Sequence, residues 1–106
     1  MTNLSTTARN KPFRYEGSVQ VGTEIYFGDK MEQHKPVTSA QYVAMFREFK
    51  GKTVVKGTAH SNPPTGSLGA WLLENVSKTQ LSSYVCAILS HEGYAKEVGA
   101  DISFNS

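Results

Sequence analysis

The most regular pattern in the chain is an amphipathic helix in its second half. Apolar residues recur there at intervals of three, one, three and one, which predicts a continuous apolar face over 77–92. Ser77 and Gln80 have the spacing of a capping box at the start of this helix, and Gly93 supplies its C-terminal stop. The apolar positions are Leu81, Tyr84, Val85, Ile88 and Leu89, and the opposite face carries Lys78, Thr79, Ser82, Ser83, Cys86 and Ser90.

Two further helices are predicted upstream of it. Thr38 and Gln41 have capping-box spacing, and the helix that they open ends at Gly51. Ser67 caps a shorter helix, which stops at Asn75-Val76 because asparagine disfavours a helix interior. Their apolar faces are formed by Tyr42, Met45, Phe46 and Phe49 in the first helix and by Leu68, Trp71 and Leu72 in the second.

Period-two alternation predicts strands in the remaining segments. Residues 12–27 read as a β-hairpin, and 52–56, 94–98 and 100–104 read as three short strands, the last two around a turn at Gly99. Residues 28–35 are expected to form a polar loop, and 57–66, which contain two prolines, an irregular loop.

With 106 residues the chain is expected to form a single globular domain over 12–106. Residues 1–11 contain one sizeable apolar side chain and are expected to form a flexible N-terminal arm. The cations of the arm, Arg9 and Lys11, together with Arg14 just after it, could follow a phosphate backbone. The net charge of +2 permits a nucleic-acid partner without requiring one.

From Thr38 onward the predicted order is helix, strand, helix, helix, strand, strand. With the segment LGAWLLENVSKTQLSSYVCAILSHEGY and the terminal pair YAKEV and ADISF, this order resembles the winged helix-turn-helix family. The resemblance covers roughly the last two-thirds of the chain and implies an α-β-α-α-β-β core. With the N-terminal β-hairpin ahead of this core, the expected fold class is α+β. The resemblance also implies that the second helix of the motif enters the DNA major groove and that the hairpin after it forms the wing.

The resemblance identifies two sets of candidate binding residues. The groove-facing residues would be Lys78, Thr79, Gln80, Ser82 and Ser83. Phosphate contacts would come from the cluster of Arg47, Lys50, Lys52 and Lys56. The predicted recognition helix, however, carries one cation and no arginine, which is unusual for a reader of guanine.

The alternative function is protein binding, by an adaptor or by a phage or mobile-element inhibitor that occludes a host protein. The serine-rich helix face would allow two backbones to approach closely, and an unpaired edge of the N-terminal hairpin could extend the sheet of a partner. Either feature would also allow a homodimer.

The residues do not predict an enzyme. Cys86 has the setting of a packing residue, and His34, His60 and His91 are too far apart in sequence to suggest a metal site. No phosphate-loop or dinucleotide motif suggests a cofactor. The single cysteine is typical of a reducing cytoplasm, and no apolar run is long enough for a signal peptide or a membrane span.

Overall fold

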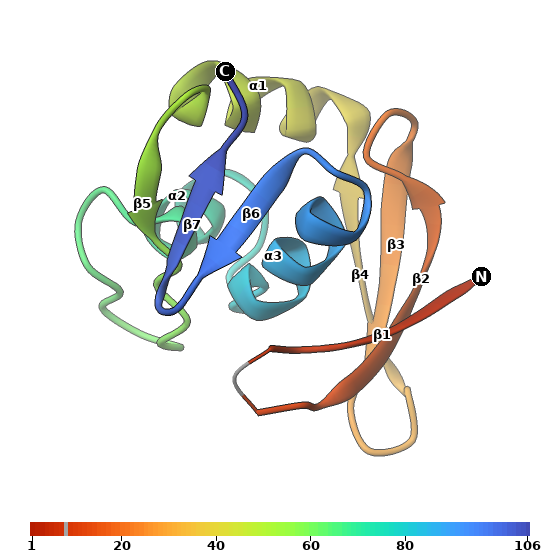
Figure 1. Cartoon of the computed structure of the whole chain (residues 1–106). Coiled ribbons are helices and arrows are strands. Elements are labelled where there is room, and N and C mark those ends of the chain that lie inside the picture. The colour runs from red at the N-terminus through yellow and green to blue at the C-terminus, as the bar shows by residue number, and fades with distance from the viewer. Residues whose placement is uncertain (8) are drawn as a thin grey trace.

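Two antiparallel sheets lie on either side of one helix, α3 (Ser82–His91) (Figure 1). The structure is a computed structural model and describes residues 1–7 and 9–106. The first sheet has the order β1-β2-β3-β4, with β1 at Thr2–Ser5, β2 at Pro12–Ser18, β3 at Gly22–Phe27 and β4 at Gln33–Thr38. The second has the order β5-β7-β6, with β5 at Thr53–Val55, β6 at Ala95–Val98 and β7 at Asp101–Phe104. Helices α1 (Ser39–Phe49) and α2 (Leu68–Asn75) pack beside them.

Helix α3 is buried on almost every side. The predicted apolar stripe is confirmed, since Leu81, Val85, Ile88 and Leu89 are fully buried. Tyr84 is half-buried and packs against the first sheet, with its ring centroid 5.1 Å from that of Phe13 and 4.8 Å from that of Phe27.

The side of α3 predicted to be exposed is also covered. Ser82 and Cys86 are both 0% exposed, because α3 packs against β6 of the second sheet as well as against β1 of the first. The prediction of an exposed serine face is therefore wrong at Ser82, while Ser90 is exposed and Ser83 is half-buried.

The start of α3 also differs from the prediction. The helix begins at Ser82 rather than Ser77, with Leu81 in the N-cap position. Ser77 accepts a hydrogen bond from the amide of Thr79 (3.1 Å), and Gln80 accepts one from the amide of Ser82 (3.1 Å). The Gln80 side-chain amide donates to the Ala59 carbonyl (2.8 Å). The Gln80 side chain therefore makes a tertiary contact in place of the predicted capping box.

The other predicted helix ends are confirmed. Thr38 and Gln41 form the reciprocal capping box at the start of α1, and the Ser67 hydroxyl accepts from the amide of Ala70 (3.1 Å) at the start of α2. At the end of α3, Gly93 has a φ of +84°. Its amide donates to the Ser90 carbonyl and that of Tyr94 to the Leu89 carbonyl, the pattern of a Schellman motif.

The predicted hairpin forms, but it is the centre of a larger sheet. Its strands β2 and β3 are flanked by β1 and β4, so neither is an edge strand. Strand β1 lies in the predicted arm and pairs with β2, placing Leu4 opposite Phe13, while residue 8 of that arm lies outside the described residues. Strand β4 begins inside the predicted loop 28–35. Both strands lie at the edges of the sheet, where few side chains are fully buried.

The second sheet follows the prediction closely. Strands β5, β6 and β7 lie within the segments 52–56, 94–98 and 100–104, with the turn at Gly99 between the last two. Strand β7 lies in the centre and pairs with β5 and with β6. From α1 onward the element order is therefore the predicted helix, strand, helix, helix, strand, strand.

Helix α2 approaches the segment after β5 so closely that only glycine fits. The amide of Gly69 donates to the Lys56 carbonyl (2.9 Å), and a Cβ atom at Gly69 would overlap the carbonyl oxygen of Gly57. The Gln80 side-chain amide lies 2.9 Å from the same Cβ position. The contact fixes α2 against the residues that lead into loop 57–66.

We predict that Gly69→Ala destabilises the protein by about 1–3 kcal/mol, the usual range for an overpacked core. In an unconstrained helix the same change stabilises, because alanine is the better helix former. Urea unfolding followed by circular dichroism measures the effect. Glu74→Ala, at an exposed position in the same helix, is the control and should shift stability by less than about 0.5 kcal/mol. A more stable Gly69→Ala variant would contradict the close approach.

Candidate functional site

A polar cleft of about 330 Å³ lies at the N-terminal end of α3. The β1–β2 turn, the segment after β5, the turn before α3 and strand β6 meet around it. Most of its lining side chains are charged or carry a hydroxyl or amide group. They are Thr6, Thr7, Arg9, Lys11, Lys56, Thr58, His60, Gln80, Ser83, Tyr84 and Glu97, together with Ala59.

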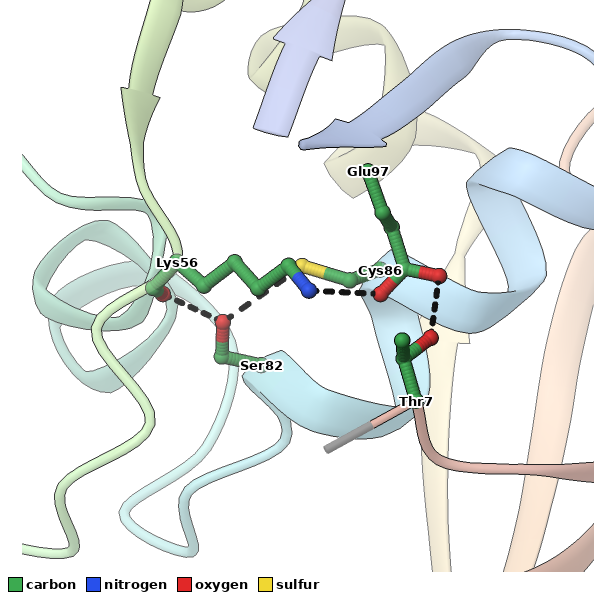
Figure 2. A network of polar contacts seen from close by, with 5 residues as sticks. All are labelled: Thr7, Lys56, Ser82, Cys86 and Glu97. Atoms are coloured by element: carbon green, nitrogen blue, oxygen red, sulfur yellow. Dashed lines mark hydrogen bonds and ion pairs between the residues drawn. The ribbon is translucent and has the colours of Figure 1, made fainter. Parts of the chain in front are cut away.

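A buried ion pair forms the inner wall of the cleft. The Lys56 ammonium lies 2.9 Å from one carboxylate oxygen of Glu97, and both side chains are at most 14% exposed. The hydroxyl of Thr7 donates to the other oxygen (2.6 Å), as Figure 2 shows. The charge of Glu97, the one acid among the described lining residues, is therefore neutralised by a neighbouring cation.

Beside this pair lies a hydroxyl and thiol pair that is directed into the protein. The hydroxyl of Ser82 donates to the carbonyl of Lys56 and lies 3.8 Å from the sulfur of Cys86 (Figure 2). Burial raises the pKa of the Cys86 thiol to about 12, against an ordinary value of 9.0. The thiol is therefore protonated at neutral pH and lacks the thiolate character of a nucleophile. This agrees with the prediction that Cys86 is a packing residue.

The rim of the cleft carries cations. Arg9 and Lys11 come from the β1–β2 turn, which is closed by hydrogen bonds in both directions between Thr6 and Lys11. Both are exposed, and within residues 1–7 and 9–106 neither forms an ion pair. His60 lies on the rim as well, from the loop after β5. The accessible part of the cleft therefore has a positive charge balance and offers hydroxyl groups from Thr58 and Ser83.

The predicted groove-facing residues do not share one exposed helix face. Lys78, Thr79 and Gln80 lie in the turn between α2 and α3, and Gln80 is 6% exposed. Ser82 is fully buried, so neither it nor Gln80 can read a DNA groove in this arrangement. Ser83 alone of the five combines a place on α3 with partial exposure, and it lines the cleft together with Gln80. Three of the five residues precede α3, and the two sheets that cover α3 bury Ser82.

The predicted basic cluster is divided by the structure. Arg47, Lys50 and Lys52 are exposed around the end of α1 and the start of β5. Lys56 is 7% exposed and held by Glu97, so its assignment as a free phosphate-binding cation is wrong. Its position just after β5 on the inner side of the second sheet accounts for this.

Part of this site can be predicted from the sequence. The sequence shows the cations of the N-terminal segment, but their neighbours Thr58, Ser83 and Glu97 lie 47 or more positions away in the chain, and no spacing rule connects them. The signal in the sequence was the contrast between a basic arm and an otherwise weakly charged chain. Their convergence depends on the pairing of β1 with β2.

Within the described part of the chain, no group of three or more His, Cys, Asp or Glu side chains is arranged to hold a metal ion. Over the same residues, no helix has the length and apolar character needed to cross a membrane. Comparison of the chain with protein-family models, with curated proteins and with solved structures finds no match.

We predict that breaking the buried pair from one side costs more stability than removing it entirely. Lys56→Met or Glu97→Leu alone should each cost about 3–5 kcal/mol, because the remaining charge stays buried without a partner. The double variant should be more stable than either single variant. Urea unfolding of the four proteins forms a double-mutant cycle, and strictly additive losses would contradict a direct interaction.

We predict that Cys86 is protected in the native protein and that its thiol contributes to alkaline unfolding. At pH 8 the native thiol should react with Ellman's reagent on the order of 100-fold more slowly than in urea. Since its folded pKa is raised, the contribution to stability is complete below pH 9 and is lost as the pH rises towards about 12. The stability of Cys86→Ala should therefore fall less steeply than that of the wild type across this range. Equal slopes would show that the thiol is not buried.

Proposed function

We propose that this protein is a non-catalytic nucleic-acid-binding protein that holds the phosphate backbone at the cleft beside the N-terminal end of α3. The observation that carries the proposal is the charge arrangement of the cleft. Arg9 and Lys11 are exposed and free of ion pairs within the described residues, while Glu97 is neutralised by Lys56 and Thr7. An anion that enters meets cations at the rim and an acid whose charge is already balanced.

The chemistry of the cleft suits phosphodiesters. Arginine and lysine supply most protein contacts to phosphate oxygens, and serine and threonine hydroxyls supply many of the rest. The cleft offers both kinds of donor, with Arg9 and Lys11 on one side and Thr58 and Ser83 on the other. These contacts carry no base information, so the proposal is of binding with little sequence preference.

The order of elements from α1 to β7 supports the resemblance to winged helix-turn-helix proteins. The proposed contact nevertheless differs from the mode that this resemblance implies. The first sheet and the second sheet cover α3 from two sides, and the half-buried Ser83 and Tyr84 in its first turn line the cleft. We therefore place the backbone contact at the end of the helix.

The structure removes one of the two features behind the protein-binding alternative and reduces the other. The hairpin strands β2 and β3 are each paired on both sides, so the hairpin has no free edge to extend a partner's sheet or to form a homodimer. The serine-rich face of α3 is covered at Ser82 and half-covered at Ser83. Phosphate binding at the cleft requires no such surface.

We predict that Arg9→Glu combined with Lys11→Glu weakens binding to a fluorescein-labelled 20-nucleotide DNA at least about 10-fold. Fluorescence anisotropy with single-stranded and double-stranded DNA and with the matching RNA, each between 50 and 300 mM KCl, measures the effect. The slope of log affinity against log salt should become shallower by about 1.8 on double-stranded DNA and by about 1.4 on single strands, since two phosphate contacts are lost.

The matched control is Lys50→Glu combined with Lys52→Glu, which changes the net charge equally at the exposed end of α1. It should leave affinity within about 3-fold of the wild type, because charges beyond a Debye length are screened. An equal loss of affinity in both variants would show that net charge, and not the cleft, determines the binding of nucleic acid. Failure of the wild type to bind any of the three nucleic acids would overturn the proposed function.

A further inference from the structure

A second hollow, which we call the Trp71 groove, lies on the other side of loop 57–66. It has a volume of about 550 Å³ and lies between the end of α1, helix α2 and the last residues of the loop. The loop thus contributes Thr58, Ala59 and His60 to the cleft and Asn62, Pro63 and Thr65 to the groove.

The floor of the Trp71 groove is apolar and aromatic. The Trp71 ring meets that of the buried Phe49 edge to face, with 6.3 Å between centroids, which fixes one side of the indole. Trp71, Pro63 and Leu73 are half-buried and line the groove, so each keeps part of its surface open. An indole beside a proline and an aliphatic side chain offers a surface on which the rings of an extended proline-containing peptide can pack.

The charges of the groove are of one sign. Its charged lining residues are Glu48 and Glu74, both exposed, and among the described residues neither takes part in an ion pair. Two unpaired carboxylates beside an apolar floor attract lysine or arginine and repel phosphates. The groove is therefore unsuited to the nucleic acid proposed for the cleft.

We infer that the Trp71 groove binds an extended segment of a partner protein in which proline lies next to lysine or arginine. The prolines would pack on Trp71 and Pro63, and the basic side chains would reach Glu48 and Glu74. A segment in the polyproline conformation loses little chain entropy on binding, which suits a shallow groove. This inference does not depend on the function proposed for the cleft.

The test is selection of random twelve-residue peptides displayed on phage against the wild-type protein, followed by titration of the enriched peptides in solution. Trp71 is the only tryptophan in the chain, so its emission reports occupancy of the groove directly. We expect enriched peptides to contain proline and a basic residue and to shift the emission of Trp71 to shorter wavelength.

Glu48→Lys combined with Glu74→Lys should weaken the binding of these peptides at least about 10-fold. Glu16→Lys combined with Asp29→Lys makes an equal charge change at exposed positions, one in β2 and one in the turn between β3 and β4. This control variant should bind the peptides within about 2-fold of the wild type. The cleft variant Arg9→Glu with Lys11→Glu should also leave peptide binding unchanged, which separates the two sites.

The inference is overturned if no peptide is enriched, or if enriched peptides lack proline or basic residues. It is also overturned if the Glu48 and Glu74 variant binds them as well as the wild type does. Circular dichroism of each variant establishes that the fold is retained before binding is compared.

Discussion

Lys56 contacts helices α2 and α3, strand β6 and the turn between β6 and β7 from one position in the chain. Its carbonyl accepts hydrogen bonds from the amide of Gly69 at the start of α2 and from the hydroxyl of Ser82 at the start of α3. Its amide donates to the carbonyl of Ala100 beside β7, and its ammonium pairs with Glu97 on β6. The arrangement of α2, α3 and the second sheet therefore depends on a polar junction at Lys56.

A polar junction of this kind contributes more to the specificity of the fold than to its free energy of unfolding. Desolvation of Lys56 and Glu97 opposes most of their attraction, so the pair contributes little net free energy. A shift of β5 against β7 would separate the two charges and leave each buried without a partner. We infer that the pair specifies the register of the second sheet. The close approach of Gly69 to Gly57 acts in the same direction, because it leaves no space for a side chain between α2 and the residue after Lys56.

The same junction separates the two proposed binding surfaces. Neutralisation of Glu97 leaves the cleft with the positive charges of Arg9 and Lys11. On the far side of loop 57–66, the Trp71 groove carries the negative charges of Glu48 and Glu74. Loop 57–66 begins at the residue after Lys56, so the contacts of Lys56 hold the start of the loop between the two surfaces in place. Each surface suits a ligand that the other repels, and in our proposals one small domain carries both.

The elements of this protein were largely determined by its sequence. Local rules predicted the capping box of α1, the cap of α2, the glycine stop of α3, the central hairpin and all three strands of the second sheet. These features depend on residues within a few positions of one another, so short-range spacing is sufficient to identify them. The apolar stripe of α3 was predicted for the same reason.

Only the tertiary structure decided which surfaces are free. The strands β1 and β4 were missed because backbone pairing with β2 and β3 forms them, with little pattern of their own. Their sheet and the second sheet enclose α3, which buries Ser82, while a contact with the Ala59 carbonyl holds Gln80 largely buried. In the sequence Lys56 is one of the four residues of a basic cluster, whereas in the fold it is buried and paired with Glu97. The spacing of residues along the chain does not contain these long-range contacts, and therefore the cleft, the Trp71 groove and the covered helix became visible only in the folded chain.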